Sequence, residues 1–281
     1  MQLIKTLFAS LMASFALALF VLPASALAQV AATSDGADRT FNIHSSAGVQ
    51  SERGISVLLR DGEGPEYEVF IPELLVQMAR EANRGTIAMI PTMGHIVVLP
   101  MPDFALRSVS TLPLLYEIDE PDHRVFELLP AGSTDRNFRR AFGMSVKTVE
   151  AGLTAEEDSR AFFGGLRDQC LLDNSGYQQD SRRTSGRSVM LAACANFKSD
   201  VAQNLDPSIR GSIDIALSYV LGETVFRFYS IHRSASWDPD SSEPPLDHTD
   251  VREIVSLLDR AMIFEDIERG ALIAAFAMAG I

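Results

Sequence analysis

Residues 213–233 read IDIALSYVLGETVFRFYSIHR. From 213 to 219, Ile, Leu and Tyr occupy alternate positions, which is the two-residue period of a strand that buries one face. Gly222 and Glu223 lie in a turn that leads into a second apolar run, residues 225–233. Two strand-like runs joined by so short a turn are typical of a β-hairpin. The sequence therefore predicts an antiparallel sheet at the centre of the protein.

The segments before this hairpin change between strand and helix patterns. Alternation over residues 144–148 predicts a strand. Thr154 and Glu157 then have the spacing of a capping box, which opens a helix. The polar stretch over residues 173–187 is expected to be a loop, and residues 188–197 a further strand.

A last amphipathic helix is predicted to open at Thr249, because apolar residues follow it at helical spacing, namely Val251, Ile254, Val255, Leu258 and Met262. From residue 143 to 264 the order is then strand, helix, three strands, helix. Strands that follow one another in sequence favour antiparallel pairing, with the helices on one face. We predict an α+β fold, an antiparallel sheet with helices packed on its face.

The chain is expected to divide near residue 135. Residues 41–135 form an N-terminal α/β region, with a helix beginning at Pro72 and two apolar, strand-like runs near residue 90. Residues 136–264 form the α+β sandwich region, either as a separate unit or as one continuous domain with residues 41–135. Residues 265–281 form an apolar C-terminal tail.

The N-terminus has the composition of an export signal. A lysine is followed by a long uncharged run rich in Leu, Phe and Ala, and then by a proline and small residues. Cleavage requires small side chains one and three positions before the cut, which Ala26 and Ala28 supply; a second candidate cut follows Ala26. We predict a signal peptide over residues 1–28, cleaved on export, and a flexible leader over residues 29–40.

Composition and net charge limit the compartment and the partners that we expect for the protein. The apolar run at the N-terminus is shorter than the roughly 20 residues that cross a bilayer, so no membrane association is expected after the signal is removed. The formal net charge of −13 makes nucleic acid and anionic lipid poor partners. The protein is expected in the periplasm or in the external medium.

Two cysteines, Cys170 and Cys194, occur in the chain, so one intramolecular disulfide is possible. In an oxidising compartment we expect them to pair. Two buried free thiols are the alternative, because free cysteine is itself a common core residue.

The segment 126–149, FELLPAGSTDRNFRRAFGMSVKTV, contains the motif Pro130-x-Gly132-x-Thr134 and precedes a helix, a cysteine, a strand, a hairpin and a helix. In this order the chain resembles small exported bacterial α+β proteins of unassigned function, whose plan is similar to the Mog1/PsbP-like sandwich. The resemblance covers about residues 100–264. It implies a fold used mostly for binding and accessory roles, and a fold alone assigns no reaction.

Catalytic motifs are absent from the sequence, and no catalytic residue is assigned. The chain has no G-x-S-x-G nucleophile motif, and its five histidines are isolated from one another. A hydrolase would need a serine, a histidine and a carboxylate that meet only in the fold. His232 and His248 are the candidate bases for such a site.

Metal-binding patterns are also weak, and no metal or cofactor is expected. The spacing Asp238-x-Asp240-x-Ser242 places oxygen atoms as a calcium loop does, but the neighbouring prolines favour a solvated acidic loop. A second group of soft ligands, Met89, Met93, His95 and Met101, could bind copper, but it lies in apolar strand sequence and is interpreted as core.

The apolar tail from residue 271 to 281 is expected to be a short helix over the core, or else a contact with a partner or a second copy. Taken together, these features favour a non-enzymatic periplasmic binding or envelope-accessory module. The alternatives are a periplasmic hydrolase with a Ser/His/carboxylate site and a carrier of a small apolar ligand.

Overall fold

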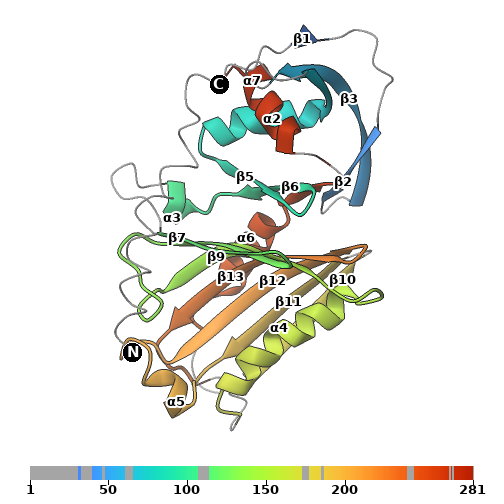
Figure 1. The fold of residues 1–281 in the computed structure, drawn as a ribbon. Coiled ribbons are helices and arrows are strands. Elements are labelled where there is room, and N and C mark those ends of the chain that lie inside the picture. Colours follow the sequence, from blue (N-terminus) through green and yellow to red (C-terminus); the bar gives the residue numbers. More distant parts are fainter. Residues whose placement is uncertain are drawn as a thin grey trace, which may run out of the picture.

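The structure is a computed structural model that describes residues 31–32, 40–45, 48–60, 66–106, 114–172, 177–184, 187–238, 244–265, 267 and 269–280. The predicted signal peptide, with Ala26 and Ala28, lies outside the described residues, as does most of the predicted leader. Within them the fold is α+β, as the sequence predicts, but it has two antiparallel sheets where the sequence indicated one (Figure 1).

The larger part of the core is built on a sheet that we call the second sheet. Its strand order is β10-β11-β12-β13-β9-β8-β7. The predicted hairpin is confirmed at its centre, where β12 pairs with β13 along their whole length. The strands are β7 (Leu114–Glu120), β8 (His123–Leu129), β9 (Arg140–Thr148), β10 (Tyr177–Thr184), β11 (Arg187–Cys194), β12 (Gly211–Leu221) and β13 (Thr224–Ser234).

The other sheet, here the first sheet, has the order β1-β3-β2-β14-β6-β5, with β4 also paired to β3. The long strand β3 pairs with β2 through its first half and with β4 through its second half. The strands are β1 (Ala31–Ala32), β2 (Thr40–Ser45), β3 (Gly48–Arg60), β4 (Glu66–Pro72), β5 (Ile87–Thr92), β6 (His95–Pro100) and β14 (Met262–Phe264).

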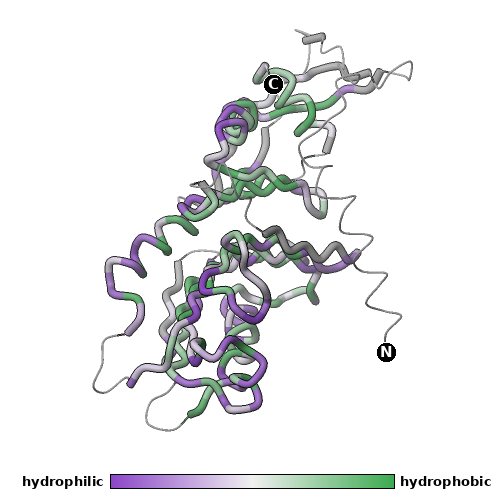
Figure 2. The backbone as a smooth tube through the Cα atoms, turned by 90° about the vertical axis from the view of Figure 1, so that its left-hand side faces the viewer, coloured by the Kyte–Doolittle hydropathy of each residue, from purple (hydrophilic) through white to green (hydrophobic). Residues whose placement is uncertain are grey.

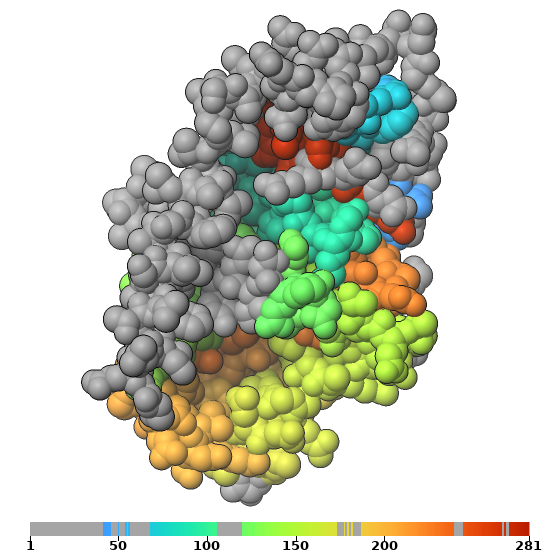
Figure 3. Space-filling view, in the orientation of Figure 1, coloured from blue at the N-terminus to red at the C-terminus, as the bar shows by residue number. Residues whose placement is uncertain are grey.

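The two sheets stack with one helix between them. Alternate residues of β12 and β13 point toward the first sheet and form a core with residues of β6, including Val97 and Leu99. Helix α6 (His248–Leu258) adds its apolar stripe to this core. Figure 3 shows the teal residues of β5 and β6 stacked on the green residues of the second sheet.

The outer face of the second sheet is covered by helix α4 (Ala155–Gln169), and short α5 (Ser199–Ala202) follows β11. The predicted capping box is confirmed, because the Thr154 hydroxyl accepts from the Glu157 N–H and the Glu157 carboxylate accepts from the Thr154 N–H. Phe163 and Leu166 bury the inner face of α4. The two glycines in this helix, Gly164 and Gly165, have open space at the Cβ position, so close packing does not explain them.

Cys170 follows α4 directly and forms a disulfide with Cys194 at the end of β11, with their Cα atoms 5.6 Å apart. Both residues are fully buried in the α4 core. The predicted pairing is therefore present, and it fastens the end of α4 to the sheet.

Helices α2 (Glu73–Asn83) and α7 (Arg269–Met278) pack together over the first sheet, and α3 (Asp103–Leu106) follows β6. In Figure 2 the tube of α7 is mostly green, the colour of apolar residues, whereas α2 is mixed. In α7 the small residues Ala271, Ala274 and Ala275 are buried in the core that α2 and α7 form with the first sheet. The apolar tail is thus a short helix over the core. No helix within the described ranges is long and apolar enough to cross a bilayer.

Two local predictions were wrong. Residues 177–184, within the predicted loop, form strand β10, which is polar because it lies at the sheet edge. Met262 was assigned to the last helix, but that helix ends at Leu258 and Met262 begins β14, which pairs with β2 and β6. A three-residue strand is too short to show a period of two.

The expected boundary between residues 135 and 136 falls between β8 and β9, which are neighbours in the second sheet. Conversely, β14 from the predicted sandwich region lies between two strands of the first sheet. The chain therefore crosses between the sheets more than once.

Candidate functional site

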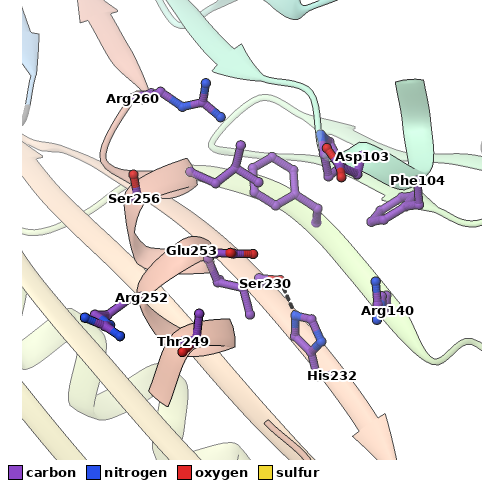
Figure 4. A pocket seen from close by; sticks show the side chains of 14 residues that line it. Asp103, Phe104, Arg140, Ser230, His232, Thr249, Arg252, Glu253, Ser256 and Arg260 are labelled. Carbon is purple, nitrogen blue, oxygen red and sulfur yellow. Dashed lines mark hydrogen bonds between the residues drawn. The ribbon is translucent and has the colours of Figure 1, made fainter. Parts of the chain in front are cut away.

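A pocket of about 600 Å³ opens between the two sheets at the end of the sandwich where α3 lies (Figure 4). Its walls come from segments far apart in the sequence: α3 with the residue before it, strands β9 and β13, and α6 with one residue shortly after its end. The lining residues are Pro102, Asp103, Phe104, Arg140, Phe142, Ser230, His232, Thr249, Arg252, Glu253, Ile254, Ser256, Leu257 and Arg260.

Helix α6 is fixed at its start by local hydrogen bonds. The Asp247 carboxylate accepts from the N–H groups of Thr249 and Asp250, at 2.6 and 2.8 Å. The Asp250 carboxylate accepts in turn from the Asp247 N–H, so a capping box sets where the helix begins. The apolar stripe of α6 packs on the core between the sheets, which turns the helix edge that carries Glu253 toward the pocket.

The strands present side chains to the pocket by simple alternation. On β13, Ser230 and His232 continue the row of Phe226 and Phe228 that faces the first sheet. The pairing of β9 with β13 places Arg140 directly opposite His232. Polar side chains from two neighbouring strands therefore lie side by side at one end of the pocket.

The pocket has an apolar interior and a charged rim. Pro102 and Phe142 are buried, and Phe104, Ile254 and Leu257 are half-buried. The charged lining residues are exposed, namely Asp103, Arg140, Arg252, Glu253 and Arg260. Ligand pockets commonly combine apolar walls with a few placed polar groups, and this volume is in their usual range.

Ser230 and His232 are joined by a hydrogen bond of 2.9 Å between the hydroxyl oxygen and Nε2. Burial, and to a smaller extent the nearby Arg140 guanidinium, lower the pKa of His232 to about 4, while the charge of Asp250 acts in the opposite direction. The imidazole is therefore neutral at pH 7, and the pair can donate and accept hydrogen bonds without adding charge.

The hydrolase alternative is only partly met by this geometry. The fold brings His232 together with a serine, whereas His248 is exposed at the start of α6 and is not a lining residue. Among the described residues, no carboxylate hydrogen-bonds to the His232 ring. The third member of a Ser/His/carboxylate site is thus missing from the described part of the chain. A base with a pKa near 4 is also poorly matched to catalysis at neutral pH.

A second polar group lies on the opposite face of the second sheet, under α4. Asp158 of α4 is completely buried and accepts from the Arg227 guanidinium at 2.6 Å through both carboxylate oxygens. Lys147 lies 2.9 Å from the same carboxylate, and Ser218 also donates to it. The Arg227 guanidinium stacks over Phe162, with Cζ 4.3 Å from the ring centroid. These groups satisfy one another, which is typical of a structural ion cluster.

Farther along this face, two carboxyl groups have raised pKa values. Burial raises the pKa of Asp214 to about 6 against a hydrogen bond from Ser212 and the charge of Arg233, while Glu127 adds to the rise. Burial also raises the pKa of Glu127, although the Tyr229 hydroxyl donates to it at 2.8 Å.

Asp214→Asn should flatten the pH dependence of stability between about pH 4 and about pH 6. Because the pKa of Asp214 is higher in the folded state, the folded protein holds this proton more tightly than the unfolded chain does. The stability that Asp214 contributes is therefore complete below its ordinary pKa of 3.8 and is lost as the pH rises through about 6. Urea unfolding across this range measures the difference between wild type and Asp214→Asn. The exposed Asp168→Asn should keep the wild-type slope, and equal slopes for all three proteins would contradict the prediction.

The sequence-predicted metal candidates do not converge in the described residues. Met89 packs against the core under α2 and α7, whereas Met93 packs against the core between the sheets. The His95 ring contacts Phe226 edge-on, and its Nδ1 lies 2.7 Å from the Met93 carbonyl oxygen. No group of three or more His, Cys, Asp or Glu side chains placed to hold a metal occurs in the described ranges. Of the calcium-loop candidate, whose sequence favours a solvated acidic loop, Asp240 and Ser242 lie outside those ranges.

Sequence reasoning selected His232 but missed its neighbours. Arg140 and Glu253 reach the pocket through the β9–β13 register and the docking of α6, both of which are long-range contacts. Neither residue belongs to a motif, so no local signal could have selected it.

The chain was also compared with known proteins. No family model matches it, and no similar curated protein or solved structure was found.

Proposed function

We propose that the protein is an exported, non-enzymatic binding module that holds a small ligand in the pocket between α6 and the second sheet. The observation that supports this function is the pocket itself, about 600 Å³ with apolar walls and polar side chains at its rim. The charged residues favour a ligand with polar groups over a purely apolar one.

Export is the second part of the proposal. The N-terminal residues have the pattern of a cleaved signal, and a buried disulfide is typical of proteins that mature outside the cytoplasm. We place the mature protein in the periplasm or the external medium. There, a binding module can serve an accessory role in the envelope. The sequence resembles the Mog1/PsbP-like sandwich, and this resemblance agrees with the proposed function because that fold is used mostly for binding and accessory roles.

Filling the pocket should abolish ligand-induced stabilisation. Leu257 is half-buried in the pocket wall, so Leu257→Trp places a larger ring into the cavity. A ligand that binds the folded state raises the melting temperature by mass action. Thermal melting with a panel of amino acids, sugars, dicarboxylates and fatty acids should therefore find compounds that stabilise wild type and not Leu257→Trp.

The matched control is Leu172→Trp, which changes an exposed leucine that follows the disulfide and does not line the pocket. It should respond to ligand as wild type does. Stabilisation that persists unchanged in Leu257→Trp would move the site away from this pocket and contradict the proposal.

A further inference from the structure

Two side chains of opposite charge, Arg140 and Glu253, line the same cavity without pairing. Neither side chain makes an ion pair or a side-chain hydrogen bond with any part of the protein that the structure describes. Elsewhere, guanidinium groups such as those of Arg187 and Arg227 are paired with aspartates.

Arg140 and Glu253 are held on different elements. Arg140 is fixed by the β9 strand, opposite His232, and Glu253 by helix α6. Figure 4 shows the Glu253 side chain reaching from α6 toward β13, and Arg140 on the other side of His232. Opposite charges that line one cavity and do not meet can be joined by a ligand that carries both complementary charges.

The other basic residues of the lining contribute less to this end of the pocket. The Arg252 Nε donates to the His248 carbonyl oxygen at 3.2 Å within α6, and Figure 4 shows its guanidinium on the far side of the helix from His232. Arg260 lies beyond the opposite end of α6. The end near His232 therefore combines the Arg140 guanidinium, the Glu253 carboxylate and the neutral Ser230–His232 pair, and the Asp103 carboxylate lies on the α3 wall of the same pocket.

We propose that the pocket binds a small zwitterion, an amino acid or dipeptide with an apolar side chain, whose carboxylate pairs with Arg140 and whose ammonium group pairs with Glu253. This inference rests on the binding function proposed above. Guanidinium and carboxylate groups form the strongest hydrogen bonds when the partner is charged. The apolar side chain of the ligand would lie on Phe104, Phe142 and Leu257, and Ser230 and His232 would supply uncharged hydrogen bonds beside the ligand carboxylate.

Blocked ligands separate the two charge pairs. Titration calorimetry would compare L-phenylalanine and L-leucyl-L-phenylalanine with their N-acetyl forms, which lack the cation, and their C-terminal amides, which lack the anion. At least one of the two zwitterions should bind wild type. Each of its blocked forms should bind at least about tenfold more weakly, because a charge-assisted hydrogen bond is lost and the protein group is left unpaired.

Protein variants also separate the two charge pairs, because each removes one charge from the protein instead of from the ligand. Arg140→Gln should weaken binding of the zwitterion and of its N-acetyl form by about tenfold and leave the amide unchanged. Glu253→Gln should weaken binding of the zwitterion and the amide and leave the N-acetyl form unchanged. Both residues are exposed, so the variants should fold, and unchanged melting temperatures would show that they do. Arg167→Gln on α4 and Glu223→Gln in the β12–β13 turn serve as controls with wild-type binding.

Three results would overturn the inference: blocked forms that bind as tightly as the zwitterion, variants that weaken all forms equally, or no binding of either zwitterion at millimolar concentration. If, at the same time, another compound stabilises wild type and not Leu257→Trp, the binding function stands and the ligand class proposed here is wrong. If no compound does so, the binding function fails as well.

Discussion

Asp158→Asn is expected to lower the free energy of unfolding by about 3–5 kcal/mol, the usual cost of breaking a buried ion pair from one side. Asn keeps the shape of the side chain but removes the charge that faces Arg227 and Lys147. The Arg227 guanidinium, whose side chain is 8 % exposed, then keeps its charge without a counterion. Urea unfolding followed by circular dichroism measures the change.

Two comparisons sharpen this test. Asp168→Asn changes an exposed residue of the same helix and should stay within about 0.5 kcal/mol of wild type. The double variant Asp158→Leu with Arg227→Leu removes both charges and should recover part of the loss, because the main penalty comes from a buried charge without its partner. A loss below about 1 kcal/mol for Asp158→Asn would mean that the cluster is not buried as described.

Removing the disulfide is expected to cost about 3 kcal/mol. The bridge spans a sequence separation of 24 residues and limits the freedom of the unfolded chain between the end of α4 and the end of β11. Urea unfolding of Cys170→Ala with Cys194→Ala should show this loss relative to oxidised wild type. Alanine leaves small cavities in the α4 core, which add to the loss.

The effect of a reductant on stability separates the contribution of the disulfide from that of the side-chain packing. Dithiothreitol should lower the urea midpoint of wild type and leave the double variant unchanged. Alkylation of the unfolded protein without reductant should add no mass. Alkylation at both cysteines under these conditions would contradict the disulfide.

The elements that the sequence predicted are those whose signal is local. The β12–β13 hairpin was found because its residues alternate and its turn is short, and the start of α4 was found from the Thr154 and Glu157 pair. Strand β10 was missed because an edge strand has one neighbour and shows little apolar alternation.

The arrangement of the elements could not be predicted from local patterns. That β14 lies between β2 and β6 depends on contacts across more than half of the chain. The pocket depends on the same kind of contact, because Arg140, His232 and Glu253 come from three separate segments. Sequence spacing selected His232 as a candidate, and only the β9–β13 register places Arg140 opposite it.

Native mass spectrometry of the protein purified from its own cells, without denaturation, tests the binding function in one step. We expect wild type to carry an added mass of a small molecule, released on unfolding, and Leu257→Trp prepared in the same way to lack it. An identical added mass in both proteins would place the ligand outside the pocket between α6 and the second sheet. Wild type that carries no added mass, and that gains none when incubated with the ligand panel, would contradict the binding function itself.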